Sequence, residues 1–308
     1  MSDTPERPAH YTLAMPDLTP VSAAALPTLI GIGNLIIQGE NLTILPALDP
    51  ASVQLIYIDP PFNTGSTRQH AVLRTVQDED GNRTGFGGRR YRTEQSPALT
   101  YADRFDDYIG FLAERIAFLR DLLTPSGTIY VHIDPRESHY VKVMLDEIFG
   151  RDCFVNEIIW AYDYGGRPKN RFPPKHDTIL MYARTPGHHA FYPDAIDRVP
   201  YMAPGLVSPE KVARGKLPTD VWWHTIVPTN GREKTGYPTQ KPLGILRRII
   251  AASSQPGDLV LDCFAGSGTT GVAAHEAGRR YLLIDQYPAA ITIMQQRLPA
   301  ATTVQITT

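Results

Sequence analysis

The chain has 308 residues, 42% of them hydrophobic, and a formal net charge of −2 at pH 7. This length allows one large α/β domain with insertions or two small domains, and the near-neutral charge gives no global signal of nucleic-acid binding. Cys153 and Cys263 form no Cys-x-x-Cys pair, so neither a metal site nor a disulfide framework is expected. The apolar stretch 23–37 is interrupted by proline and glycine, and no basic region with a cleavage site precedes it, so we expect a cytoplasmic protein.

Short, nearly continuous apolar runs predict strands that are buried on both faces of a sheet. In chain order these runs are 35–38, 53–58, 129–133, 259–261 and 282–284. Helical patterns lie between them, at 108–123, 139–149 and 243–254. This alternation predicts an α/β fold with a doubly wound, mostly parallel sheet.

Three segments do not follow this alternation of strands and helices. Residues 1–27 are rich in Pro, Thr and Ala and are interpreted as an N-terminal arm. Residues 64–100 are rich in Gly and Arg and are interpreted as a long loop, within a first half at 28–185. Residues 186–236 carry many Pro, Gly and basic residues together with Trp222 and Trp223, which predicts a functional insertion before a final half at 237–308.

A glycine-rich turn follows the predicted strand 259–261 and opens a helix. It reads Asp262-Cys263-Phe264-Ala265-Gly266-Ser267-Gly268-Thr269-Thr270. A Walker loop would need a lysine that is absent here, and a dinucleotide fingerprint fits the glycine spacing but not the opening acid. Asp285 ends the next predicted strand, 23 residues after Asp262, about the distance at which a carboxylate meets ribose hydroxyls. The pattern predicts an adenosine-containing cofactor that need not carry a pyrophosphate.

A rigid acidic turn, Asp59-Pro60-Pro61-Phe62, follows the predicted strand 53–58. The two prolines fix the backbone and remove two donors, so the turn presents a carboxylate and carbonyl oxygens, which are all acceptors. An acceptor-only pocket beside an aromatic ring suits a planar amine with two N–H donors. Because both turns follow parallel strands, we expect Asp59 and Gly266 to face each other despite their separation in sequence.

Together these segments resemble the β-class DNA amino-methyltransferases, which use S-adenosyl-L-methionine and act on adenine N6 or cytosine N4. That family places its Asp-Pro-Pro-Tyr/Phe motif before its Phe-x-Gly-x-Gly-Thr loop, the order found here. Residues 237–242 resemble the segment that flanks the cofactor, and 38–41 resemble a Gly-Asp-Asn/Cys turn, with Glu40 in place of the usual Asp. The similarity covers most of 35–298; Cys263 replaces a usual Pro, and 186–236 match nothing general, as for a variable target-recognition region.

The resemblance implies a circularly permuted, seven-stranded methyltransferase sheet that transfers a methyl group to the N6 amine of an adenine flipped out of double-stranded DNA. It makes 28–185 the catalytic half, with the loop 64–100 facing DNA, and the implied catalytic residues are Asp59, Pro60, Pro61 and Phe62. The implied cofactor-binding residues are Glu40, Asn41, Asp59, Thr239, Gln240, Lys241, Asp262, Phe264, Ala265, Gly266, Ser267, Gly268, Thr269 and Asp285. Basic side chains expected on DNA are Arg83, Arg89, Arg90, Arg92, Lys211, Arg214, Lys216, Arg232 and Lys234.

Alternative functions remain open at this point. Cytosine-N4 transfer needs the same amine chemistry, although cytosine enzymes of the resembled family usually begin the motif with Ser rather than the Asp59 found here. RNA or protein-amide methyltransferases use similar turns, usually with the cofactor loop first, and a silent nucleic-acid-binding module is a third class. The family also suggests a homodimer and, in restriction-modification systems, a cognate restriction enzyme.

Overall fold

The computed structural model describes residues 18–63, 68–70, 73–77, 83–84, 90–95, 99–101, 105–228 and 231–306. The chain divides into two compact units, Met1–Pro60 with Ile109–Thr308, and Pro61–Tyr108. Residues 1–17 of the expected N-terminal arm lie outside the described part. No helix within the described part is both long enough and apolar enough to cross a membrane.

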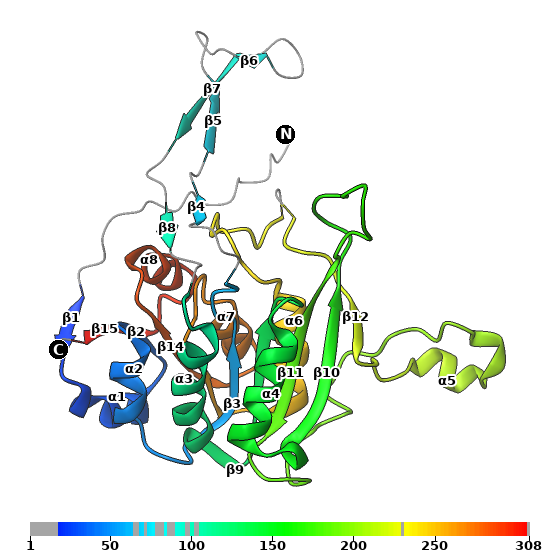
Figure 1. Cartoon of the computed structure of the whole chain (residues 1–308), viewed down its shortest axis with the longest axis horizontal. Helices are drawn as coiled ribbons and strands as arrows, with labels where there is room; N and C mark the ends of the chain where they lie inside the picture. Colours follow the sequence, from blue (N-terminus) through cyan, green and yellow to red (C-terminus); the bar gives the residue numbers. More distant parts are fainter. Residues whose placement is uncertain are drawn as a thin grey trace, which may run out of the picture. The chain divides into compact units, whose positions relative to one another are not determined.

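Seven strands form the centre of the sheet in the first unit, in the order β2-β14-β13-β3-β9-β11-β10 (Figure 1). In that order they are β2 (Leu35–Gln38), β14 (Arg280–Asp285), β13 (Leu259–Asp262), β3 (Val53–Ile58), β9 (Leu123–Ile133), β11 (His176–Ala183) and β10 (Phe154–Ala161). The pairings from β2 to β9 are all parallel, whereas β11 runs antiparallel to β9 and to β10. The prediction of a doubly wound, mostly parallel sheet is confirmed.

The sheet is wider than the seven strands that the resemblance implies. It has ten strands, because β15 (Thr302–Ile306) and β1 (Thr19–Val21) extend it beyond β2, and β12 (Val221–Trp223) extends it beyond β10. β1 belongs to the expected N-terminal arm and β12 to the expected insertion. Edge strands expose unpaired backbone groups, which short neighbouring segments can satisfy without any strong apolar pattern of their own.

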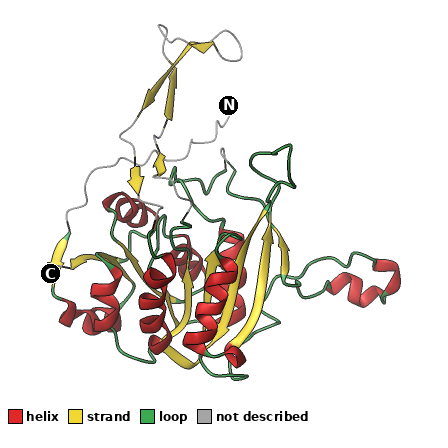
Figure 2. Cartoon of the chain, in the orientation of Figure 1, coloured by secondary structure: helices red, strands yellow, loops and turns green. Residues whose placement is uncertain are grey.

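Helices cover both faces of the sheet, as Figures 1 and 2 show. The α-helices of the described part are α1 (Leu26–Ile32), α2 (Asn41–Ile44), α3 (Tyr108–Leu122), α4 (Ser138–Phe149), α5 (Pro209–Arg214), α6 (Leu243–Ser253), α7 (Thr269–Glu276) and α8 (Pro288–Arg297). Short 3-10 turns occupy Ala23–Ala25, Leu45–Ala47, Arg151–Cys153 and Pro204–Leu206. Residues of α6, α7 and α8 share one buried apolar cluster with alternate residues of the central strands, whereas α3 and α4 lie over the other face.

Burial on both faces explains the continuous apolar runs. All six residues of β3 and all four of β13 are buried. A strand with only one covered face would alternate apolar and polar residues instead. At the carboxyl edge, Asp59 directly follows β3 and Asp262 is the last residue of β13.

The second unit consists of short antiparallel strands. β4 (Arg68–His70) pairs with β8 (Leu99–Tyr101), and β7 (Arg90–Gln95) pairs with both β5 (Leu73–Gln77) and β6 (Arg83–Thr84). The segment 64–100 is therefore not the continuous loop expected from the sequence. Its strands are short and rich in arginine, so they lack the apolar periodicity by which strands are identified.

Candidate active site at the carboxyl edge of the sheet

The acidic double-proline turn follows β3 at the carboxyl edge. The Asp59 side chain is 16% exposed, and its Oδ2 accepts a hydrogen bond from Lys241 Nζ at 2.5 Å. Its Oδ1 is buried and has no hydrogen-bond partner within the described part of the chain. Pro60 is buried, and Pro61 and Phe62 begin the second unit. One carboxylate oxygen is thus held by a lysine, and the other is left as an acceptor without a donor.

The glycine-rich turn lies at the end of the adjacent strand. β13 pairs in parallel with β3, so Asp262 and Asp59 emerge side by side at the same edge. Gly266 and Gly268 have φ values of 51° and 73°, in the left-handed region that favours glycine. A Cβ on Gly268 would also lie 2.6 Å from Met294 Cγ. Strand order therefore places Asp59 and the glycine turn at the ends of neighbouring parallel strands, as expected from the sequence.

Asp262 and Asp285 organise the glycine turn. Asp262 accepts hydrogen bonds from Phe264 N at 3.0 Å and from the Thr270 hydroxyl at 2.6 Å. Asp285 accepts from Gly266 N at 2.8 Å and from Tyr287 N at 2.9 Å. Both carboxylates therefore fix the backbone of the turn, a role that sequence reasoning did not assign to them.

Burial dominates the electrostatics of these two acids. It raises the pKa of Asp262 to about 7, and the negative charges of Asp59 and Asp285 add to that rise. Burial also raises the pKa of Asp285 to about 6. Three carboxyl groups are thus concentrated at the ends of β3, β13 and β14, and a bound cation would stabilise their ionised forms.

An arginine that the sequence analysis did not single out connects the Glu40 turn to the glycine turn. Arg115, on α3, donates to Glu40 Oε1 at 2.6 Å and to Asn41 Oδ1 at 2.7 Å, and Asn41 in turn donates to the carbonyl of Cys263 at 3.1 Å. Arg115 is only 6% exposed and lies on the same helical face as the buried Leu112. A lone arginine within an apolar helical stripe is the sequence signal that could have identified it.

The segment that precedes α6 divides its side chains between two tasks. Gln240 accepts from Thr235 N at 2.8 Å and donates to the carbonyl of Glu233 at 2.5 Å, so its amide bonds within the segment. Lys241 instead contacts Asp59. Of the predicted cofactor ligands 239–241, the structure therefore brings Lys241 into direct contact with the acidic turn.

A buried polar chain crosses four strands beneath the site. The Tyr57 hydroxyl lies 2.8 Å from His132 Nδ1, His132 Nε2 lies 3.1 Å from Asp177 Oδ2, and the Tyr162 hydroxyl donates to Asp177 Oδ1 at 3.0 Å. Burial opposes ionisation of Asp177, but its hydrogen bond to His132 and the nearby positive charge outweigh this and keep its pKa below the ordinary value. Both ring nitrogens of His132 have hydrogen-bond partners, and its side chain is fully buried. This hydrogen-bonded chain of side chains therefore links the strands and does not expose a catalytic base.

The basic residues expected on DNA lie on several separate elements. Lys211 and Arg214 lie on α5, which projects from the sheet beyond β12 (Figure 1), and Arg214 is 3.3 Å from Asp194. Lys216 pairs through its backbone with Val199, while Arg232 and Lys234 lie near the Gln240 segment. In the second unit, Arg83 lies on β6 and Arg90 and Arg92 lie on β7, whereas Arg89 is outside the described residues.

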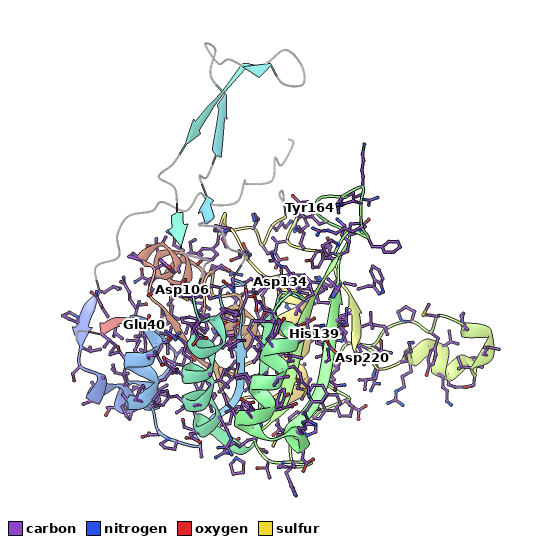
Figure 3. The ribbon with its side chains drawn as sticks, in the orientation of Figure 1. Glu40, Asp106, Asp134, His139, Tyr164 and Asp220 are labelled. Carbon is purple, nitrogen blue, oxygen red and sulfur yellow. The ribbon has the colours of Figure 1, made fainter. Side chains whose placement is uncertain are left out.

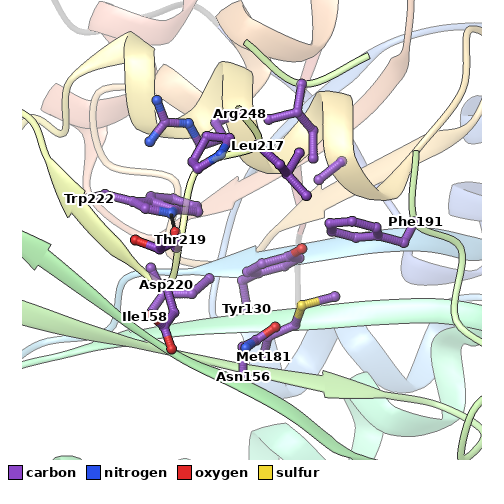
Figure 4. Close-up of a pocket in the computed structure, with 13 residues that line it drawn as sticks. Tyr130, Asn156, Ile158, Met181, Phe191, Leu217, Thr219, Asp220, Trp222 and Arg248 are labelled. Carbon is purple, nitrogen blue, oxygen red and sulfur yellow. Dashed lines mark hydrogen bonds between the residues drawn. The ribbon is translucent and has the colours of Figure 1, made fainter. Parts of the chain in front are cut away.

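A separate cavity of about 350 Å³ is lined by residues of β9, β10 and β11 together with residues of the insertion and of α6, several of which Figure 4 shows. Tyr130, Met181 and Trp222 contribute to its walls, and Arg248 lies with its guanidinium 4.9 Å from the Trp222 ring. Asp59, Asp262 and Asp285 are not among its lining residues. The cavity therefore does not belong to the acidic site.

Comparison with known proteins agrees with this geometry. Residues 53–296 match the N6_N4_Mtase family, described as DNA methylase. The chain is 30% identical to the DNA adenine methyltransferase YhdJ of Escherichia coli K12, over 86% of this chain and 83% of that protein. In fold it is similar to the PvuII DNA methyltransferase, which is cytosine-N4-specific (TM-score 0.58, 15% identity, 88% of this chain and 95% of that one). It is also similar to M1.HpyAVI in its complex with SAM (TM-score 0.54, 21% identity, 86% and 98%).

The fold is thus that of an α/β methyltransferase, and the candidate site lies at the carboxyl edge of its sheet. The chain belongs to the DNA methylase family of N6/N4 amino-methyltransferases.

Proposed function

We propose that the chain transfers a methyl group from S-adenosyl-L-methionine to the N6 amine of adenine in double-stranded DNA. The observation that carries this proposal is the Asp59 carboxylate. Its Oδ2 is held by Lys241, and its buried Oδ1 has no donor among the described residues. A buried acceptor without a donor costs free energy, so it is tolerated best where a ligand supplies the hydrogen bond.

An exocyclic amine supplies the donors that this turn lacks. The amine is a poor nucleophile because its lone pair is delocalised into the ring. Asp59 Oδ1 and the carbonyl of Pro60 each accept one N–H, which favours a pyramidal nitrogen with its lone pair directed away from the turn. These hydrogen bonds strengthen as positive charge develops on the nitrogen, so they stabilise the transition state more than the ground state. Phe62, in the same motif, offers a ring for stacking on the base.

The acidic cluster fits the proposed cofactor. S-adenosyl-L-methionine carries a sulfonium cation, and it supplies the activated methyl group. Asp59, Asp262 and Asp285 lie at three neighbouring strand ends. Burial raises the pKa of Asp262 to about 7, so its ionised form costs free energy that a nearby cation would offset. We assign the ribose contact to Asp285 and the adenine contact to Glu40. Phe264, Ala265, Gly266, Ser267, Gly268 and Thr269 form the rest of the proposed cradle.

Adenine is favoured over cytosine by the first residue of the acidic turn. Asp59 begins the motif, where cytosine-N4 enzymes of the family usually have Ser. The relative YhdJ, named a DNA adenine methyltransferase, supports the same choice.

The direct test is the identity of the methylated nucleoside. Purified protein is incubated with duplex DNA and S-adenosyl-L-methionine labelled in the methyl group, and the digested DNA is analysed by mass spectrometry. We expect label in N6-methyl-2′-deoxyadenosine. Label in N4-methyl-2′-deoxycytidine would replace adenine by cytosine as the target, and label in neither nucleoside would contradict the proposed function.

The Asp59→Ala variant tests the assigned chemistry. Loss of one preorganised transition-state interaction should lower turnover by at least about 100-fold. Binding of S-adenosyl-L-methionine, measured by titration calorimetry, should survive with a much smaller loss than turnover, because Asp262 and Asp285 remain at the neighbouring strand ends. A purified variant with near-normal turnover would refute the role of Asp59.

A further inference from the structure

The connection between β10 and β11 emerges at the reactive edge of the sheet. β10 runs antiparallel to β11, β11 antiparallel to β9, and β9 parallel to β3. The carboxyl end of β10 therefore lies at the same edge as Asp59, three strands away, or about 14 Å at the usual strand spacing. We call residues 162–175, which join the two strands there, the edge hairpin; Figure 3 shows Tyr164 on it, beyond the ends of the strands.

The edge hairpin is strongly basic in an otherwise near-neutral chain. Between its ends it has one acid, Asp163, against the four bases Arg167, Lys169, Arg171 and Lys175. Asp163 is already paired with Arg167, at 3.1 Å. The hairpin thus carries an excess of positive charge beside the active site, and this charge complements a polyanion.

Two exposed aromatic rings accompany this charge. Phe172 is 97% exposed, the highest value among the large apolar side chains of the described residues, and Tyr164 is 63% exposed. A single exposed apolar residue needs no special explanation. A fully exposed phenyl ring next to Arg171, on a basic hairpin at the reactive edge, combines the charge that holds a phosphate backbone with a ring that stacks on bases.

The base of the hairpin is firmly held. Tyr162 N donates to the carbonyl of Lys175 at 2.8 Å, and the Tyr162 hydroxyl donates to Asp177 within the buried polar chain. Lys175 Nζ donates to the carbonyls of Tyr164 and Gly165 at 2.7 and 2.8 Å. Pro173 and Pro174 directly follow Phe172 and restrict its backbone. The loop that carries the ring therefore starts and ends at a base held by hydrogen bonds.

The gap that a flipped base leaves in duplex DNA is a suitable binding position for the Phe172 ring. A base that reaches Asp59 must leave the stack, and that costs a few kcal/mol of stacking and pairing, roughly. Proteins that distort DNA offset such costs by inserting apolar side chains between base steps. The separation of the hairpin from Asp59 is similar to the width of the major groove, about 12 Å. A duplex that delivers one base to Asp59 thus passes within reach of the hairpin.

We propose that Phe172 enters the base stack of duplex DNA as the target base leaves it, while Lys169 and Arg171 contact the flanking phosphates. Phe172 is in this view a positioning residue, because it holds the DNA open rather than touching the reacting atoms. The proposal rests on the proposed function, since only a flipped base leaves a gap to fill.

The test compares matched and weakened duplexes. Oligonucleotides carry the sequence found to be methylated by the wild-type chain, with the target base either correctly paired or mispaired. Single-turnover methylation is measured for the wild type, Phe172→Ala and Phe172→Trp. Ile32→Ala is the matched control, because Ile32 is 76% exposed and precedes β2, at the opposite edge of the sheet.

We expect Phe172→Ala to lower the rate on the paired duplex about tenfold or more, in line with the loss of one stacked ring. The loss should shrink to less than about twofold on the mispaired duplex, whose target base is already partly unstacked. Phe172→Trp and Ile32→Ala should stay close to wild type. A 2-aminopurine placed beside the target should brighten when the wild type binds and stay dim with Phe172→Ala.

Two results would overturn the proposal. An unchanged rate of Phe172→Ala on the paired duplex would mean that the ring does not enter the stack. Equal losses on paired and mispaired duplexes would mean that Phe172 contributes to DNA affinity, folding or a contact with a second protein instead. If the wild type itself methylates no duplex, it is the proposed function that fails, so the two failures are distinguishable.

Discussion

At the scale of single residues, the contact between Lys241 and Asp59 has the clearest consequence. Sequence reasoning placed Lys241 among the cofactor ligands, whereas the structure places its ammonium 2.5 Å from the Asp59 carboxylate. Under the proposed function, a lysine in this position would fix the orientation of the Asp59 carboxylate so that Oδ1 faces the substrate amine. Lys241 is then a positioning residue for catalysis, and this role is separable by experiment from cofactor binding.

We therefore expect Lys241→Met to lower the turnover number on the order of 100-fold, as for other small misplacements of reacting groups. The dissociation constant for S-adenosyl-L-methionine should change little, and Lys241→Arg should recover part of the turnover. Steady-state kinetics and calorimetry on the same preparations separate the two quantities. A weakened cofactor affinity with normal turnover at saturation would instead support the cofactor-ligand role.

At the scale of structural elements, the convergence of three strand ends gives the site its pH dependence. The ends of β3, β13 and β14 bring together Asp59, Asp262 and Asp285, and burial raises the pKa of Asp262 to about 7 and that of Asp285 to about 6. A cationic ligand favours the ionised forms of Asp262 and Asp285, so its binding releases the protons that these two groups hold in the free protein.

The affinity for S-adenosyl-L-methionine should therefore be full above about pH 7 and fall as the pH drops through 7 and then 6. Each unit by which the cation lowers a pKa can change the affinity about tenfold. Calorimetry between pH 8 and pH 5 measures this, with the uncharged S-adenosyl-L-homocysteine as control. Parallel pH curves for the two ligands would show that these carboxyl groups do not sense the sulfonium charge.

The packing of α7 on the sheet depends on Gly271, which directly follows the glycine-rich turn. A Cβ on Gly271 would lie 2.5 Å from Leu283 Cδ1 and 2.9 Å from Leu298 Cδ1. Overpacking costs about 1–3 kcal/mol, whereas replacing a helical glycine by alanine gains at most about 1 kcal/mol.

We expect Gly271→Ala to lower the free energy of unfolding by about 1–2 kcal/mol in urea titrations. Gly31→Ala is the control, because Gly31 is also helical, in α1, and a Cβ there meets nothing within 4 Å. That control should be neutral or slightly stabilising. Destabilisation of both variants to the same extent would contradict the packing argument.

At the scale of the whole molecule, the distribution of charge matters more than its sum. The net charge is −2, yet basic residues gather on α5 and on the edge hairpin. DNA binding therefore has to depend on local phosphate contacts, and its strength must fall with salt.

Replacing Lys211 and Arg214 by alanine should weaken duplex binding and reduce the slope of log K against log salt by about 1 for each phosphate that is no longer neutralised. Fluorescence anisotropy at several salt concentrations measures both. Arg151→Ala serves as the control, since Arg151 has a side chain that is 86% exposed and lies just before β10, at the opposite edge of the sheet. An unchanged slope for the α5 variant would remove α5 from the DNA-binding surface.

The amino-acid sequence by itself determined the central strands, their helices and the two reactive turns. Strands buried on both faces have continuous apolar runs, and rigid or left-handed turns require proline and glycine. Each of these features can therefore be recognised from a short stretch of sequence. This reasoning could not predict the short edge strands β1 and β12 or the strands within 64–100. It also missed the hydrogen bonds that Arg115 donates to Glu40 and Asn41. Only the tertiary structure decided the contact of Lys241 with Asp59 and the emergence of the edge hairpin beside the site, because strand order brings together residues that no local pattern relates.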